Sequence, residues 1–354
     1  MLLRSTDRGL YCEAGDFHID PWMPVDRAVI THAHGDHARW GSRAYLGSRE
    51  GERVLRTRMG PDARIRPVEF GEPVELNGVR VSLHPAGHIL GSAQVRVEHR
   101  GEVWVVSGDY KTEADPTCTP FEAVRCHTFV TESTFGLPIY RWRPDAEVFA
   151  GIDAWWRRNA AEGRASLLFG YALGKAQRLL AGIDPSIGPI YTHGAVERLT
   201  ADYRETGIPM PPTRNPMAEP RGHDWGGAMV VAPPSAHGTP WMRRFGNAST
   251  AFASGWMRVR GHRRRRSVDR GFVLSDHVDW PSLLAAVDAT GAECVWVTHG
   301  YREPVVRWLR EHGLQAQAVA SRWEGETDEG DVVVAEDSAS EGADSPESAT
   351  DAQK

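Results

Sequence analysis

The sequence predicts an α/β protein. It contains both strand and helix patterns, and enough apolar residues to form a sizeable core. Residues 10–110 contain short apolar runs separated by turns, which is typical of a strand-rich region. From about residue 143, apolar strand patterns alternate with helical patterns, which indicates an open α/β unit. Hydrophobic residues make up 41% of the 354 residues, and this length suggests about two domains.

The first part of the chain is expected to consist mainly of short strands. In order, these strands are FHID, RAVIT, ARIRPVEF, PVELNGVRVSLHP and SAQVRVEHRGEVWVVSGD. In the last stretch, EHRGEV interrupts two alternating runs at a glycine, which predicts a β-hairpin.

The later part alternates between the two patterns. AEVFAGIDAWWRRNAAEG is expected to be helical, SLLFGYA a strand, LGKAQRLLAGI a helix, and GPIYTHG and AMVVAPP further strands. GFVLSDH, ECVWVTHG and the helical REPVVRWLREHG then resume a compact domain. Trp155 and Trp156 fall in a helical pattern and are expected to lie in the core.

The net charge of -6 averages two unlike regions. Residues 324–354 contain eleven acidic residues, one lysine and few apolar residues, so this tail is expected to be disordered. Residues 1–323 contain 40 Lys and Arg against 36 Asp and Glu, a net charge of +4. A mildly basic body permits a polyanionic substrate without requiring one.

The four cysteines are spread along the chain without a CxxC pair, which favours reduced thiols over a disulfide framework or a cysteine zinc site. No run of 18 apolar residues is present, and the first residues turn charged after MLL. Neither a membrane span nor a signal peptide is predicted, and the expected location is the cytoplasm.

Four potential metal ligands lie within six residues in the stretch THAHGDH, namely His32, His34, Asp36 and His37. Alternation at the end of the preceding strand places His32 and His34 on the same side, and Gly35 permits a turn that presents the other two nearby. Imidazole nitrogens and carboxylate oxygens are ligands of zinc-like ions. A histidine-rich surface loop is the alternative, but four such residues behind one strand favour a metal site.

HAHGDH has the form HxHxDH and resembles the signature of the metallo-β-lactamase fold, an αββα sandwich with its metal site at one edge between two sheets. PAGHILGSAQV and VVSGDYK resemble the later motifs of that fold and imply His88 and Asp109 as ligands. Asp20 in FHIDP resembles the first motif, whose aspartate orients the metal-binding loop; a simple turn carboxylate is the alternative.

TESTFG, SDHVDW and VTHGYREP resemble motifs A, B and C of the β-CASP nucleases and imply roles for Glu132, His277 and His299. The resemblance covers about residues 8–324 and implies an inserted α/β cap, the β-CASP domain. The expected divisions are a metallo-β-lactamase domain in two parts, 1–136 and 268–323, a β-CASP insertion at 137–267, and the acidic tail at 324–354.

The resemblance implies a two-metal phosphodiesterase that uses zinc or manganese. His32, His34 and His88 would hold one ion, Asp36, His37 and His299 the other, and Asp109 would bridge them. Asp36, Asp109, His277 and Glu132 are the implied catalytic residues, with His277 as a general acid or phosphate ligand that Glu132 orients. A purely structural His277–Glu132 pair is the alternative.

In their residues and in their order, the motifs are also similar to those of the bacterial DNA ligase-associated exonucleases. This implies exonuclease action on single-stranded DNA or strand ends in DNA repair, beside an ATP-dependent ligase and a helicase. An RNA-processing nuclease is the first alternative, because His299 has the form common in the RNA enzymes of the family. A catalytically silent scaffold and a glyoxalase-type thioester hydrolase are the others.

An arginine-rich stretch, GWMRVRGHRRRRSVDRG, precedes motif B. Guanidinium groups bridge phosphates and stack on bases, so this stretch is expected to line the path of a nucleic-acid strand, with Trp256 as a stacking face. A solvated loop is the alternative. The implied nucleic-acid-binding residues are Arg258, Arg260, Arg263, Arg264, Arg265 and Arg266.

Overall fold

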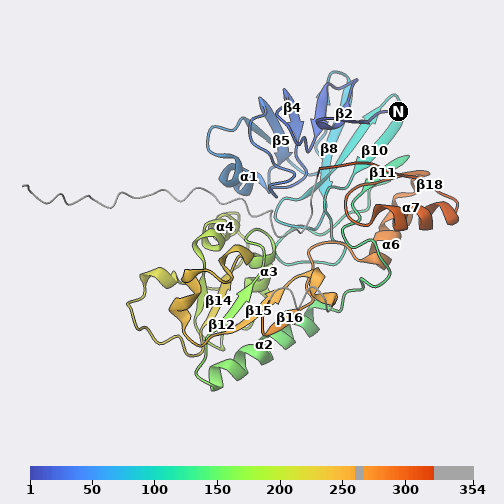
Figure 1. The fold of residues 1–354 in the computed structure, drawn as a ribbon. Coiled ribbons are helices and arrows are strands. Elements are labelled where there is room, and N and C mark those ends of the chain that lie inside the picture. Colours follow the sequence, from blue (N-terminus) through green and yellow to red (C-terminus); the bar gives the residue numbers. More distant parts are fainter. Residues whose placement is uncertain (260–266, 323–354) are drawn as a thin grey trace, which may run out of the picture.

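The computed structural model describes residues 1–259 and 267–322, and within them the strands form three sheets flanked by helices (Figure 1). The prediction of a mixed α/β fold is therefore confirmed. All four cysteines are free thiols. No helix in these ranges is both long and apolar enough to cross a lipid bilayer. The acidic tail expected at 324–354 lies outside the described residues.

The first sheet is formed by the N-terminal strands in simple sequence order. Its first three strands pair antiparallel and the later ones parallel. The strands are β1 (Arg4–Thr6), β2 (Gly9–Cys12), β3 (Phe17–Ile19), β4 (Arg27–Val29), β5 (Ala44–Ser48) and β6 (Ile65–Val68).

The second sheet joins strands from both ends of the chain. Its order is β18-β17-β11-β10-β9-β8-β7. The strands are β7 (Val74–Leu76), β8 (Val79–Pro85), β9 (Ala93–His99), β10 (Glu102–Val106), β11 (Thr128–Thr131), β17 (Cys294–Val297) and β18 (Gln315–Ala318). The predicted hairpin is confirmed: β9 and β10 pair antiparallel around Arg100 and Gly101, which both have positive φ.

The two sheets pack face to face, because one hydrophobic cluster combines Phe17 and Ile19 of the first sheet with Val81 and Val95 of the second. The helix α1 (Glu52–Met59) packs on the other face of the first sheet through Val54 and Leu55. The helices α6 (Trp280–Thr290) and α7 (Arg302–Glu311) cover the other face of the second sheet. We call this part the two-sheet body.

The third sheet is entirely parallel, in the order β13-β14-β12-β15-β16, and we call it and its helices the third-sheet unit. The strands are β12 (Ser166–Phe169), β13 (Ile190–Thr192), β14 (Met229–Ala232), β15 (Ser249–Ala253) and β16 (Arg270–Phe272). The helices are α2 (Asp145–Ala161), α3 (Lys175–Gly182), α4 (Gly194–Glu205) and the short 3-10 turns η1 (Pro216–Ala218), η2 (Pro234–Ala236), η3 (Pro240–Phe245) and η4 (Gly255–Arg258).

The helix α2 shows why the predicted helical pattern holds. Its buried residues Val148, Ile152 and Trp155 recur at helical spacing on the face that packs against the third sheet. Trp156 is buried in the same cluster, so the prediction that both tryptophans lie in the core is confirmed.

The structure adds elements that the sequence patterns did not identify. The helices α1 and α4 lie in stretches for which no helix was predicted, and both present short apolar faces interrupted by charged residues. The third sheet also continues to Phe272, past the boundary expected at residue 267, because β16 pairs with β15.

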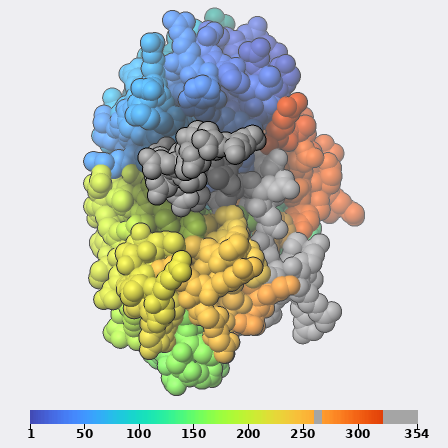
Figure 2. Space-filling view, turned by 60° about the vertical axis from the view of Figure 1, so that its left-hand side comes forward, coloured from blue at the N-terminus to red at the C-terminus, as the bar shows by residue number. Residues whose placement is uncertain are grey.

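The third-sheet unit is attached to the body beside the first sheet. The helices α1 and α4 contact each other, Arg53 pairs with Glu205, and the buried hydroxyl of Tyr203 accepts a hydrogen bond from the Leu90 amide at 3.1 Å. Figure 2 shows this junction where the blue surface of the body meets the yellow-green surface around α4.

Candidate metal centre

The HAHGDH stretch leaves the first sheet just after β4 and turns back on itself. The amides of His37 and Ala38 both donate to the His34 carbonyl, at 3.1 and 2.8 Å. This turn brings His37 back toward His32, so that their ring centroids lie 4.2 Å apart. The local backbone therefore gathers the imidazoles of one short segment.

Asp20, at the end of β3, fixes this segment from behind. Its carboxylate accepts hydrogen bonds from the Thr31 amide at 2.8 Å, the Thr31 hydroxyl at 2.6 Å and Nδ1 of His37 at 2.7 Å. Asp20 is fully buried and has a φ of 43°, a conformation that aspartate tolerates better than most residues. These contacts are of the kind expected of a residue that orients the metal-binding loop.

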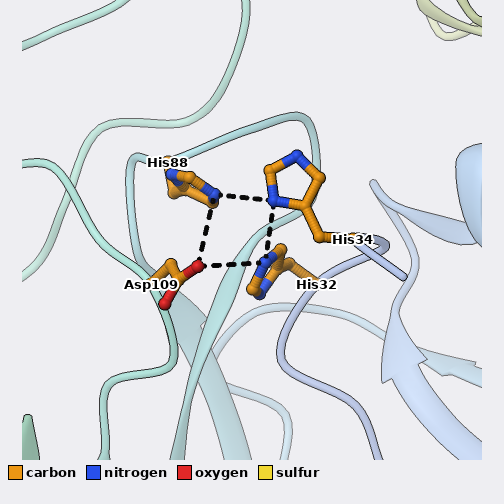
Figure 3. A group of neighbouring side chains, drawn as sticks. All are labelled: His32, His34, His88 and Asp109. Carbon is orange, nitrogen blue, oxygen red and sulfur yellow. Dashed lines mark hydrogen bonds and ion pairs between the residues drawn. The ribbon is translucent and has the colours of Figure 1, made fainter. Parts of the chain in front are cut away.

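Four ligand atoms, from His32, His34, His88 and Asp109, all lie within 4.8 Å of one another (Figure 3). We call them the histidine group. Nδ1 of His34 lies 3.1 Å from Nε2 of both His32 and His88. Oδ2 of Asp109 lies 3.5 Å from Nε2 of His32 and 3.9 Å from Nε2 of His88. A tetrahedron of nitrogen and oxygen ligands around zinc has edges of about 3.3 Å, so these separations fit one ion.

In each of the three imidazoles, the hydrogen bond made by the outward-facing nitrogen determines whether the inward-facing nitrogen carries a proton or a lone pair. Nε2 of His34 lies 3.2 Å from the Leu173 carbonyl, and Nδ1 of His88 lies 2.8 Å from the Asp276 carbonyl. A carbonyl only accepts, so both nitrogens donate. In each neutral ring the inward-facing nitrogen then carries a lone pair.

His32 follows the same arrangement through a hydroxyl group. Its Nδ1 lies 3.0 Å from the Thr31 hydroxyl, whose own hydrogen is directed to Asp20. Three lone pairs therefore converge beside a carboxylate, which is a ligand set for a cation.

The protonation states of the three imidazoles and of Asp109 are those that favour cation binding. Burial lowers the pKa of His34, and it lowers the pKa values of His32 and His88 well below the ordinary value, so the rings are neutral. Burial raises the pKa of Asp109, but nearby His37 and His299 outweigh it and hold that pKa well below its usual range.

Asp36, His37 and His299 form a second set of side chains around Asp109, and we call them the mixed group. Nε2 of His37 lies 3.6 Å from both Oδ2 of Asp36 and Oδ2 of Asp109, and Nε2 of His299 lies 3.0 Å from Oδ1 of Asp109. Burial disfavours the imidazolium form of His37, but Asp36 and Asp109 outweigh burial and raise its pKa to about 10. Asp109 is therefore the side chain that the two groups share.

Glu132 and His277 form a buried pair next to both groups. Nδ1 of His277 donates to the Glu132 carboxylate, with distances of 3.0 and 2.9 Å to its two oxygens. The Tyr110 amide also donates to Glu132, at 2.9 Å. Nδ1 of His277 lies 4.0 Å from Oδ2 of Asp109, and the His277 ring lies 4.7 Å from that of His88.

The arginine-rich stretch is only partly described. Arg258 is exposed, and its Nε donates to the Ile139 carbonyl at 3.2 Å. Trp256 is half-buried and packs against Phe135, with ring centroids 4.8 Å apart. The expected strand-binding residues Arg260, Arg263, Arg264, Arg265 and Arg266 lie outside the described residues.

Sequence reasoning missed the groups that hold the imidazoles from outside. The carbonyls of Leu173 and Asp276 are backbone atoms, and no residue type identifies them in advance. A weak signal existed in GKAQR, where a lysine and an arginine lie on a short helix that is buried almost throughout. Charged residues are rarely buried without partners.

No protein-family model matches the chain. Over 315 residues it is 33% identical to a protein of Opitutus terrae named "Probable DNA ligase", which covers 88% of this chain and 30% of that protein. It is 29% identical to Cleavage and polyadenylation specificity factor 73 of Drosophila melanogaster, over 48% of this chain and 27% of that one. It is 28% identical to Endoribonuclease YSH1 of Saccharomyces cerevisiae, over 34% and 16%. The chain thus spans less than a third of each relative.

A structural neighbour has the same fold at low sequence identity. It is a crystal structure of a protein of unknown function from Enterococcus faecalis V583, with a TM-score of 0.57, 10% identity, and coverage of 84% of this chain and 80% of that one. The sequence relatives are members of one family, and the Opitutus protein is similar to nearly the whole of this chain. The chain belongs to the metallo-β-lactamase/β-CASP family.

Proposed function

We propose that this protein is a metal-dependent exodeoxyribonuclease that hydrolyses phosphodiester bonds at DNA strand ends with two divalent ions, zinc or manganese. The observation that carries the proposal is the convergence of three imidazole lone pairs beside the Asp109 carboxylate, which a second set of side chains also contacts. Nuclease relatives over part of the chain support the same reaction class.

The proposal assigns the architecture accordingly. The two-sheet body, with helices on both outer faces, would be the αββα sandwich, and the third-sheet unit would be the β-CASP cap. The first part of the body would then end near residue 136, and the cap would extend from residue 137 to Phe272, because β16 belongs to its sheet. The second part of the body would follow up to residue 323.

In this proposal, one set of residues would bind the metal ions and another would supply a proton. Divalent cations in such sites make water a stronger nucleophile at neutral pH and offset the negative charge of the phosphodiester. His32, His34, His88 and Asp109 would hold one ion, and Asp36, His37, His299 and Asp109 the other. His277 would bring a proton on Nε2 to the leaving oxygen, because Nδ1 is engaged by Glu132, which keeps the ring in place.

The surroundings of the centre support action at strand ends. His34 contacts the Leu173 carbonyl of the third-sheet unit, so the centre lies where the two units meet. Of its proposed ligands, only His34 and Asp36 are partly exposed, and the others are buried. A single strand threads into such a site more easily than a duplex.

The choice of DNA rests on how far the similarities extend. The Opitutus protein named "Probable DNA ligase" matches 88% of this chain. The Drosophila polyadenylation specificity factor matches 48% of it, and the yeast endoribonuclease matches 34%. The matched region is only 30% of the Opitutus protein, which leaves room there for another function beside this unit. An ATP-dependent ligase is therefore the partner we propose first, and a helicase follows only from the family resemblance.

An RNA-processing nuclease is the second candidate, favoured by His299 and by the endoribonuclease relatives. End-labelled single-stranded DNA and RNA of one sequence, incubated with the protein and zinc or manganese, separate the two. We expect DNA to shorten progressively from one end and circular single-stranded DNA to resist. Faster cleavage of RNA would favour the second candidate, and cleavage of the circle would exclude a pure exonuclease.

A further inference from the structure

Two of the three imidazoles in the histidine group are held by the third-sheet unit or by the segment that leaves it. The carbonyl that accepts from His34 belongs to Leu173, in the turn before α3. The carbonyl that accepts from His88 belongs to Asp276, shortly after β16. The directions of these rings therefore depend on how the third-sheet unit packs against the body.

The turn that carries Leu173 is fixed by its own helix. The side chain of Gln177 accepts from the Gly174 amide at 2.8 Å and donates to the Ala172 carbonyl at 3.1 Å, on the two sides of Leu173. Gly174 has a φ of 84°, and a Cβ there would lie 2.3 Å from Cγ2 of Ile89. Only glycine allows the turn to approach the His88 loop this closely.

Arg178, one turn further along α3, is a hub for three segments. Its guanidinium contacts Asp276 Oδ1 at 2.8 Å, the Ser275 carbonyl, Asp115 Oδ2 at 3.1 Å and the Asp145 carboxylate. The side chain is almost fully buried, with 3% of its area exposed. Asp115 lies six residues after Asp109 in the chain, so the guanidinium also contacts the segment that follows the shared carboxylate.

The hub brings buried charges of both signs together. Lys175 pairs with Asp276 at 2.9 Å, and Lys111 lies 3.6 Å from Asp145. Together with Arg178, these cations face the carboxylates Asp115, Asp145 and Asp276, and Lys111 also lies 3.6 Å from the half-exposed Glu113. A planar guanidinium can reach several acceptors at fixed angles, whereas a lysine ammonium cannot reproduce that fork.

We propose that Arg178 is a positioning residue of the metal centre: by anchoring Asp276, whose carbonyl accepts from Nδ1 of His88, it sets the direction of the His88 ring. The third-sheet unit is thus part of the metal site and not only a cover over it. This inference rests on the metal centre in the proposed function. Groups that orient metal ligands typically change metal affinity by about 10- to 100-fold when they are altered.

The test compares Arg178→Lys with the wild-type full chain. Zinc affinity is measured by competition with a chromophoric chelator, and the visible spectrum of the cobalt-substituted protein reports ligand geometry. We expect R178K to bind zinc about 10- to 100-fold more weakly and to show altered cobalt bands. Thermal unfolding of the metal-free proteins reports whether the fold is kept.

The matched control is Arg204→Lys. Arg204 also bridges a carboxylate and a carbonyl in the third-sheet unit, with Glu197 at 2.7 Å and Pro211 at 2.9 Å, but has no contact with the centre. We expect R204K to bind zinc like the wild type. Asp276→Asn serves as a second variant, since it keeps the backbone carbonyl and the side-chain volume, and it allows the test if R178K does not fold.

In a double-mutant cycle, R178K and D276N should lose no more affinity together than the larger single loss, because they disrupt one anchor. Zinc affinity equal to wild type in both single variants would overturn the inference while leaving the proposed function intact. A loss of the same size in R204K would also overturn it, since any damaged ion pair would then suffice. A wild-type protein that binds neither zinc nor cobalt would instead refute the metal centre itself.

Discussion

The two groups of side chains around Asp109 are built on different electrostatic principles. The histidine group offers three neutral imidazoles whose other nitrogens are held by two carbonyls and a hydroxyl. The mixed group contains a second carboxylate, Asp36, and a histidine whose pKa is raised to about 10 by its acidic neighbours. A cation therefore meets lone pairs prepared for it in the first group, but must displace a proton from His37 in the second.

The largest expected effect comes from the residue that both groups share. Asp109→Asn keeps the side-chain volume but removes the charge, so both groups should lose metal and phosphodiester cleavage should fall by at least about 1,000-fold. Cleavage rates and bound metal measured on the same preparation test this, with circular dichroism as the control for folding. A variant that keeps two bound ions would show that the groups do not depend on Asp109.

The second effect separates the groups by pH. Below pH 10 the metal-free His37 carries a proton, so cation binding in the mixed group releases it, and affinity there should rise about tenfold per pH unit between pH 6 and 8. His32 and His88 are already neutral in that range, so affinity in the histidine group should change little. Zinc titrations at several pH values measure both steps. If the zinc affinities of both groups changed equally with pH, the proposed electrostatic difference between the groups would be wrong.

A smaller effect tests the groups one at a time. Asp20→Asn weakens the contact with Nδ1 of His37, whereas Thr31→Val removes the hydroxyl that accepts from His32. We expect about 10- to 100-fold weaker binding in the mixed group for D20N, and a loss nearer tenfold in the histidine group for T31V. Stepwise metal titration reports which ion is affected. Equal losses of both ions in T31V would mean that Thr31 acts only through Asp20.

The smallest effect is expected far from both groups. Arg53 and Glu205 pair at the surface between α1 and α4 and are 52% and 58% exposed. Arg53→Ala should lower the free energy of unfolding by less than about 1 kcal/mol, since exposed pairs are screened by solvent, and should leave both metal affinities unchanged. Chemical denaturation and metal titration check this. A weakened metal site in R53A would show that the α1–α4 junction also supports the centre.

The sequence was most informative where chemistry depends on side-chain type. HAHGDH, GHILGS and SGDYK contain the residues that the structure brings together, because imidazole and carboxylate groups are recognisable in the chain. The strand patterns and the hairpin at Arg100 were equally readable from alternation and from glycine. The mixed α/β class followed from the same patterns.

The sequence was least informative about features that depend on backbone atoms or on contacts between distant segments. The Leu173 and Asp276 carbonyls have no side-chain signature, although they hold two imidazoles. The helix α1 buries only Val54, Leu55 and Met59 among charged residues, so its pattern is weak. Arg178 reads as an ordinary helix residue, because its three carboxylate partners come from distant parts of the chain.

In the second sheet, β11 pairs with β17, with Thr128 opposite Cys294, and the whole third-sheet unit lies between them in the chain. A ribosome makes the chain from its N-terminus, so the edge of β11 stays exposed until the insertion has been translated and β17 has emerged. His299 lies two residues after the end of β17, so the last imidazole of the proposed centre is synthesised after the whole third-sheet unit. Until β17 has been made, β11 therefore has one unpaired edge at which a nascent chain can aggregate, and the proposed metal centre lacks its last imidazole.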